Sequence, residues 1–246
     1  MVETRRGAFD MRTYFTKRQQ ELNNEARLHA QKVNLKIGYR RAQDLITETG
    51  WTNPLTGTEP NVLLMGFEGF HTADTFVDFV HSKNPAAKIA VADFSHHPLQ
   101  ECYENGLDKV KGVQLVEADT TALGFADESF DQIETDGLLQ WLSPDQKRKA
   151  IAEWFRVLRP GGIVTTRDRS VSILEDTNTW DRYTRIRKEF YNRFGSVPYA
   201  TTTEVLQYQF KSQGFETTMI PDQSERKGRK LMYDIVAKKP EIQKAA

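Results

Sequence analysis

The spacing of apolar positions changes once along this chain of 246 residues, near residue 61. Residues 8–49 predict helix, weakly in their polar first half and clearly in their second half, where Gly50 marks the end. The apolar face of that second half is predicted to carry Tyr39, Ala42, Leu45 and Ile46. Residues 52–60 then predict a loop, because Pro, Gly and Asn dominate them.

After residue 61, short apolar runs alternate with amphipathic helices. Such runs are typical of parallel strands that are buried on both faces. The predicted strands are 61–66, 87–94, 113–119, 130–136 and 161–168. Residues 215–240 predict two more strands joined by a polar loop, and therefore an antiparallel hairpin. The sequence predicts an α/β protein with a doubly wound, mostly parallel sheet that ends on an antiparallel strand.

Three predicted helices follow the fourth and fifth strands. The first of these helices is predicted to begin at Ser143, as the cap, and Pro144. Its apolar stripe ends at the motif RPGG. Residues 176–194 predict a second helix, and Thr201 with Glu204 predicts a capping box for a third, which Gly214 ends. The second helix carries an aromatic stripe made of Trp180, Tyr183, Phe190, Tyr191 and Phe194.

Polar residues gather where the predicted strands end. In doubly wound sheets, ligands bind beyond the carboxyl ends of the strands, at the point where strand order reverses. The residues at these ends are Gly66, Glu68 and Gly69, then Asp93, then Asp119 and Thr120, and finally Thr135 and Asp136. A carboxylate accepts two hydrogen bonds from vicinal ribose hydroxyls, and Asp93 lies 27 residues after Gly66, near the spacing of a ribose-binding acid. A single acid would more simply cap a helix, but the ordered set favours a nucleoside site.

Four segments carry a family resemblance: VLLMGFEGF, VADFS, VEADTTALGFADESFDQI and EWFRVLRPGGIV. In this order and spacing the chain resembles the class I S-adenosylmethionine-dependent methyltransferases, in particular their small-molecule branch, over about residues 61–240. The resemblance implies a seven-stranded, Rossmann-like sheet whose final strand is antiparallel, and S-adenosylmethionine as cofactor. Because they precede the sheet, residues 1–58 are predicted to form an N-terminal helical cap. Residues 59–246 are predicted to form the methyltransferase core, with a helical insertion at about 172–199.

The resemblance also implies roles for particular residues. Gly66 would let the backbone approach the methionine part of the cofactor, Asp93 would hold the ribose, and Phe94 would pack on the adenine. Asp119 and Thr120 would meet the adenine edge, and the remaining candidates for cofactor contact are Glu68, Gly69 and Thr135. The helix at 176–194 occupies the place where relatives insert a lid over the acceptor, so its aromatic stripe fits either a lid or ordinary core packing.

The opening loop departs from the family pattern. The family usually places an acid two residues before the first glycine and further glycines at alternate positions, whereas this chain has Leu64, Glu68 and Phe70 there, with Gly69 shifted by one. A carboxylate at Glu68 would pair with the cofactor's ammonium or sulfonium and replace the missing acid. A nicotinamide site is excluded, because the GFEGFH stretch does not supply G-x-G-x-x-G and Glu68 would face a pyrophosphate.

Methyl transfer needs positioning of the acceptor and, for an oxygen or nitrogen acceptor, a base that removes its proton. The candidate catalytic residues are Asp136, His71, Tyr14 and Tyr183, although each also has an ordinary structural interpretation. His71, His96 and His97 do not predict a metal site: two of them are adjacent, and the single cysteine, Cys102, supplies no thiolate cage.

The composition restricts the kinds of binding partner that we expect. Lys plus Arg and Asp plus Glu both number 34, so a polyanionic partner such as nucleic acid is disfavoured. The N-terminal stretch has no apolar leader, and no run is long enough to span a bilayer, so we expect a cytoplasmic protein without a membrane partner. A homo-oligomer is compatible with the sequence.

Three hypotheses follow. The first is a small-molecule methyltransferase, and the second is a methyltransferase-fold protein with a repurposed or scaffold role, motivated by Glu68 and Phe70. The third is a macromolecular methyltransferase, which would call for a basic face or an added domain that this neutral composition does not show.

Overall fold

The computed structural model describes residues 25–175, 177–194, 198–199, 201–221 and 231–241. Tyr14 and the first half of the predicted N-terminal helix therefore lie outside the described residues. The helices are α2 (Glu25–Glu48), α3 (Phe70–Lys83), α4 (His96–Glu104), α5 (Pro144–Val157), α6 (Thr177–Phe194) and α7 (Thr203–Ser212). Short 3-10 helices are η1 (Pro54–Thr56), η2 (Leu107–Lys109) and η3 (Leu139–Trp141).

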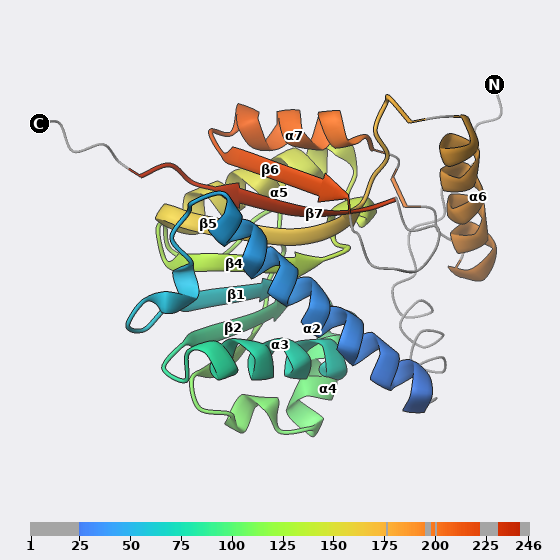
Figure 1. Ribbon diagram of the computed structural model, residues 1–246. Coiled ribbons are helices and arrows are strands. Elements are labelled where there is room, and N and C mark those ends of the chain that lie inside the picture. The colour runs from blue at the N-terminus through green and yellow to red at the C-terminus, as the bar shows by residue number, and fades with distance from the viewer. Residues whose placement is uncertain (1–24, 176, 195–197, 200, 222–230, 242–246) are drawn as a thin grey trace, which may run out of the picture.

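One seven-stranded sheet forms the centre of the molecule (Figure 1). Its strands are β1 (Asn61–Met65), β2 (Lys88–Asp93), β3 (Val113–Glu117), β4 (Phe130–Asp136), β5 (Leu158–Arg169), β6 (Glu216–Pro221) and β7 (Met232–Lys238). The order is β3-β2-β1-β4-β5-β7-β6, and β7 pairs antiparallel with both β5 and β6. The predicted fold class and terminal hairpin are confirmed, and the order reverses between β1 and β4.

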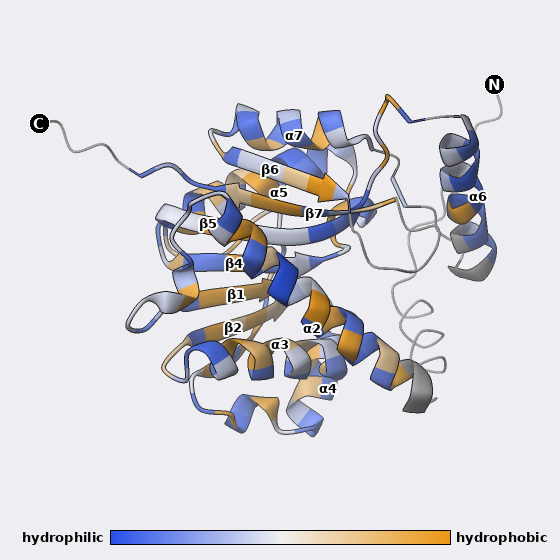
Figure 2. Cartoon of the chain, in the orientation of Figure 1, coloured by the Kyte–Doolittle hydropathy of each residue, from blue (hydrophilic) through white to orange (hydrophobic). Residues whose placement is uncertain are grey.

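Alternation along β1 explains the two helical layers. Val62 and Leu64 face the layer of α2, α3 and α4, whereas Leu63 and Met65 face α5 and α7. Figure 2 shows β1 and β2 in hydrophobic colours, as expected of strands covered on both faces. The predicted stripe of α2 is buried at Tyr39, Ala42, Leu45 and Ile46, so this helix packs on the sheet as its periodicity indicates.

The helix α6 stands apart from both layers, beyond the ends to which the parallel strands point (Figure 1). Its inner face packs through Tyr183 on Val171, just after β5, and on Leu231, just before β7. Tyr191 of the predicted aromatic stripe is exposed, and the side chains of Phe190 and Phe194 are outside the described part. The stripe is therefore only partly a packing surface.

Two predicted boundaries are wrong. Leu158 was expected in the helical stripe but begins β5, because it pairs with Phe130 of β4, and a register shift in that pairing lets the RPGG motif lie within the strand. The cap of α7 is Thr202 rather than Thr201: its side chain accepts from the Val205 amide. Glu204 does not close a capping box there, since its carboxylate binds the Ser172 hydroxyl and the Ile173 amide.

Candidate functional site

The loop after β1 is built around Gly66. Its φ of +71° is a left-handed conformation, and a Cβ atom there would lie 2.9 Å from Cδ1 of Leu138. Only glycine fits this turn without strain. The Gly66 amide donates to the Ala92 carbonyl at 2.9 Å, which holds the loop against the end of β2. The predicted first glycine thus lies at the switch point, and its backbone carries no side chain. In this structure the side chain of Leu138, from the segment that follows β4, packs against that backbone.

Asp93 joins this loop to β2. One carboxylate oxygen accepts from the Phe67 amide at 3.2 Å and the other from the Ser95 amide at 2.8 Å. The side chain is 3% exposed, and burial raises its pKa to about 6 against two amide hydrogen bonds that lower it. Each carboxylate oxygen accepts two hydrogen bonds, so a position remains on each for a ribose hydroxyl. Phe94, next in sequence, is 53% exposed and fits an adenine face.

The loop around Glu68 and Gly69 contacts two helices, α2 and α4. Gln31 of α2 donates to Glu68 at 2.9 Å, so the N-terminal helix contacts this loop directly. Gly69 precedes α3 without a side chain to cap it, and Glu101 of α4 takes that role by accepting from the Phe70 amide at 3.2 Å. A Cβ on Gly69 would lie 2.6 Å from the same Glu101 oxygen. The shifted glycine therefore makes room for a carboxylate that comes from another helix.

The residues after β3 divide between surface and core. Asp119 is exposed and accepts from both the amide and the hydroxyl of Thr121, each at 2.8 Å. Thr120 is buried, and its hydroxyl accepts from the indole of Trp154 at 2.9 Å. Asp119 remains accessible to an adenine edge, whereas the Thr120 hydroxyl already serves the packing of α5.

The end of β4 is held by β5. Thr135 is fully buried, and its hydroxyl bonds that of Thr166 at 2.6 Å inside the sheet. Asp136 forms a bidentate pair with Arg167, at 3.1 Å to Nε and 2.9 Å to Nη2. A side-chain contact of Thr135 with a cofactor would have to replace its bond to Thr166, and the Asp136 carboxylate is oriented by the guanidinium.

Two other catalytic candidates lie in different places. His71 is in the first turn of α3, where burial, followed by Lys32, lowers its pKa. Tyr183 of α6 is buried, accepts from the Thr201 amide at 3.3 Å, and has a pKa raised by burial. Tyr14 lies outside the described residues. Among the described residues, His71, Tyr183 and Asp136 are thus not gathered into one hydrogen-bonded set.

Asp168, at the end of β5, is a site residue that sequence reasoning missed. Its side chain is fully buried and accepts from the amides of Leu139 at 2.7 Å, Gln140 at 3.0 Å and Arg169 at 2.9 Å. Burial raises its pKa to about 7, while the charge of the buried Lys147 on α5 lowers it. The signal was available, because the fifth predicted strand, like three others, ends at an acid.

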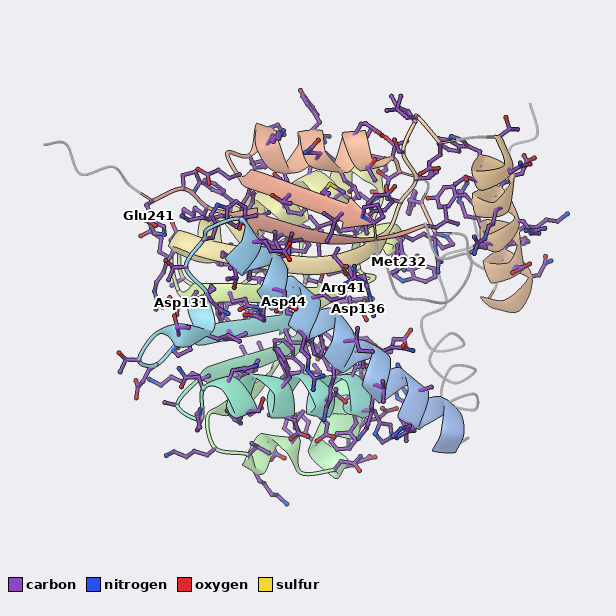
Figure 3. The ribbon with its side chains drawn as sticks, in the orientation of Figure 1. Arg41, Asp44, Asp131, Asp136, Met232 and Glu241 are labelled. Atoms are coloured by element: carbon purple, nitrogen blue, oxygen red, sulfur yellow. The ribbon has the colours of Figure 1, made fainter. Side chains whose placement is uncertain are left out.

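A second missed feature lies between α2 and the sheet. Arg41 of α2 pairs with the buried Asp234 of β7 at 2.8 Å, and a small cavity nearby is lined by Tyr39, Glu134 and Asp136 among others. Figure 3 marks Arg41 on α2 and Asp136 at the end of β4. Within the described ranges no cluster of His, Cys, Asp or Glu could hold a metal ion. The helices described there include none long and apolar enough to cross a membrane.

Comparisons with known proteins agree with this geometry. Residues 67–166 match the family described as "Methyltransferase domain". An uncharacterized protein of Haemophilus influenzae is 45% identical over 64 residues, which are 26% of this chain and 25% of that protein. The ubiquinone/menaquinone biosynthesis C-methyltransferase UbiE of Cronobacter sakazakii is 30% identical over 115 residues, 46% of this chain and 45% of that protein. The matches thus span between a quarter and a half of these curated relatives.

Solved structures share the fold. An S-adenosylmethionine-dependent methyltransferase from Mesorhizobium loti has a TM-score of 0.58 at 16% identity, covering 76% of this chain and 93% of that one. Human N-acetylserotonin methyltransferase in complex with SAM has a TM-score of 0.54 at 14% identity, over 74% of this chain and 48% of that one. The [4+2]-cyclase SpnF has a TM-score of 0.57 at 17% identity, over 82% and 80%.

The sheet order and the matched segment make this chain similar to the class I S-adenosylmethionine-dependent methyltransferases. The resemblance found in the sequence is confirmed, and the cofactor of this class is S-adenosylmethionine.

Proposed function

We propose that the protein transfers the methyl group of S-adenosylmethionine to a small-molecule acceptor. The observation that carries this proposal is the junction of the Gly66 loop with Asp93 at the switch point, next to the exposed ring of Phe94. A bare backbone, a ribose-binding carboxylate and an aromatic face are the three groups that the cofactor requires there.

When bound, the cofactor supplies a methyl group on a positively charged sulfur. The acceptor's nucleophilic atom forms its bond to the methyl carbon as the carbon–sulfur bond breaks, and a proton on the acceptor leaves to a base or to water. This chain contributes mainly positioning, which supplies on the order of 7–11 kcal/mol in favourable cases. The acceptor would lie beyond β4 and β5 under α6, where Tyr183 and Asp136 are the nearest of our candidate residues and His71 flanks the cofactor side.

The small-molecule acceptor is supported by the balanced charge and by the printed names of the UbiE relative and the N-acetylserotonin methyltransferase, both of which concern small molecules. We further propose that 1–58 form a helical cap, which the contacts of Gln31 with Glu68 and of Lys32 with Asp74 support. Residues 59–246 would form the core, with a lid within about 172–199. A cytoplasmic location without nucleic-acid or membrane partners, and with a homo-oligomer allowed, remains part of this proposal.

Calorimetry with S-adenosylmethionine and S-adenosylhomocysteine tests the proposal. The parent protein should bind both, and Asp93→Ala should weaken binding by roughly 1.5–3 kcal/mol, because charge-assisted hydrogen bonds to the ribose are lost. Asp108→Ala, at an exposed acid in η2, is the matched control and should bind as the parent does. Unchanged affinity in Asp93→Ala would mean that this carboxylate only joins the Phe67 and Ser95 amides.

The second candidate is a methyltransferase-fold protein with a repurposed role. Two contacts favour it: Glu68 is engaged by Gln31, and Glu101 occupies the amide at the start of α3, so the loop that should receive the cofactor already holds two carboxylates with partners. The cyclase SpnF shows by its title that the fold serves other reactions. Absence of any heat or thermal shift with both forms of the cofactor would select this second candidate.

A further inference from the structure

The segment after β4 touches both halves of the carboxyl edge of the sheet. We call residues 137–141 the linkage segment. On one side, the side chain of Leu138 covers the bare backbone of Gly66, with its Cδ1 2.9 Å from the position that a Cβ would take. On the other side, the carbonyl of Gln140 accepts from the Tyr199 amide at 2.7 Å. The cofactor loop and the chain that returns from α6 therefore meet through these few residues.

The return from α6 is in turn attached to that helix. The Arg187 guanidinium donates to the Pro198 carbonyl at 2.9 Å, and the Thr201 amide donates to the Tyr183 hydroxyl at 3.3 Å. Both donations link α6 to the residues on either side of Tyr199. Gln140 is consequently connected to α6 by hydrogen bonds, through Tyr199 and the residues near it.

Asp168, at the end of β5, holds the linkage segment through hydrogen bonds. Its two oxygens accept the amides of Leu139 and Gln140 at the start of η3, and its charge lies near the buried ammonium of Lys147. The Gln140 side chain adds contacts within the same group, donating to the Gly137 carbonyl at 3.0 Å and accepting from Arg169 at 3.2 Å. The segment is thus a small hydrogen-bonded unit held by a single carboxylate.

We propose that the linkage segment transmits occupancy of the cofactor loop to the α6 lid, with Asp168 as the positioning residue that makes the segment move as a unit. The inference rests on the proposed function, because it requires a cofactor that approaches Gly66. That approach must displace Leu138, which now covers the backbone. The displacement carries Gln140 with it and thereby shifts the return chain and α6.

Hydrogen–deuterium exchange with and without S-adenosylhomocysteine, read together with calorimetry, tests this coupling. In the parent, the ligand should slow exchange in the loop around Gly66 and also in 177–194 and 198–203. Leu138→Ala removes the side chain that covers Gly66, so affinity should stay equal or rise while protection of α6 is lost. A variant that was merely destabilised would lose both.

Asp168→Asn provides the second variant. An amide cannot accept on its nitrogen, so at least one of the three amide bonds is lost, and we expect roughly fivefold weaker binding together with loss of α6 protection. Asp234→Asn is the matched control, since Asp234 is a similarly buried acid whose ion pair is with Arg41 on the opposite face of the sheet. It should keep the protection of α6.

The outcomes separate the two proposals. If the parent does not bind S-adenosylhomocysteine, the proposed function falls and the coupling falls with it. If the parent binds and the Gly66 loop is protected while α6 is not, the coupling alone is overturned. Parent-like protection of α6 in Leu138→Ala would also overturn it, and this variant decides the matter should Asp168→Asn not fold.

Discussion

At the scale of single residues, the proposed function requires Asp93 to bind a ribose as an anion although its side chain is buried. Burial raises its pKa to about 6, while the amides of Phe67 and Ser95 favour its charged form. Below that pH the free protein carries a neutral carboxyl group, and charge-assisted binding of ribose hydroxyls requires its proton to leave. Under the proposed function, the affinity for the cofactor should therefore depend on pH through this one carboxyl group.

We predict that the affinity for S-adenosylhomocysteine falls as the pH drops below about 6, by at most about tenfold per pH unit. Calorimetry between about pH 5 and pH 8 measures this, because binding at low pH must release a proton. Asp93→Asn stays neutral throughout and should show weak, nearly constant affinity. A parent whose affinity is flat over the same range would place the ionisation of Asp93 outside the binding step.

At the scale of elements, α3 begins without a cap of its own. Gly69 has a φ of +152°, and Glu101 of α4 supplies the acceptor for the Phe70 amide. Two helices that follow successive strands are thereby fixed relative to each other at the entrance of the cofactor loop. The departure from the usual glycine pattern is compensated by this contact between helices.

Gly69→Ala should therefore destabilise the protein by about 1–3 kcal/mol, since it combines backbone strain with a 2.6 Å approach to the Glu101 oxygen. Chemical unfolding measures the loss. In Gly69→Ala combined with Glu101→Ala the clash disappears, so the two losses should not add. Gly124→Ala is the control, because a Cβ there meets nothing within 4 Å. Strict additivity of the double variant would show that Glu101 is not the obstacle.

Local pattern was sufficient for most elements. The apolar runs of β1 to β5, the cap at Ser143 and the hairpin at the end all carry short-range signals, and the structure contains each of them, although β5 begins earlier than predicted. The wrong boundaries at Leu158 and Thr201 depend on strand pairing and on the Ser172–Glu204 contact, which join residues distant in sequence. The same limit explains why Asp168 was missed: its role depends on amides about thirty residues earlier.

At the scale of the whole molecule, α2 is held on the sheet by polar contacts as well as apolar ones. Glu134 is buried under it, hydrogen-bonded to the Thr165 hydroxyl. The titratable and charged groups facing Glu134 are Asp136 on its own strand, Arg167 on β5, Asp234 on β7, and Tyr39 on α2. The two arginines here, Arg41 and Arg167, already pair with two aspartates, so an ionised Glu134 would be an unmatched charge.

This arrangement fixes the direction of a pH effect on stability. Burial, opposed by the Thr165 hydrogen bond, raises the pKa of Glu134 well above its ordinary value of 4.5. Between that value and the raised one, the folded protein holds a proton that the unfolded chain has lost. The contribution of Glu134 to stability therefore decreases as the pH rises from about 4.5, with a slope of at most about 1.4 kcal/mol per pH unit.

Glu134→Gln isolates this effect, because glutamine has the shape of the protonated acid and does not titrate. We expect parent and variant to have similar unfolding free energies near pH 5, with the variant gaining on the parent steadily toward pH 8. Glu216→Gln, at an exposed acid that begins β6, is the control and should keep a constant difference from the parent. If Glu134→Gln also kept a constant difference over this range, Glu134 would already be ionised under α2 near pH 5. The charges of Arg41 and Arg167 would then have to stabilise three carboxylates, and α2 would be docked by an ionic cluster instead of a neutral acid.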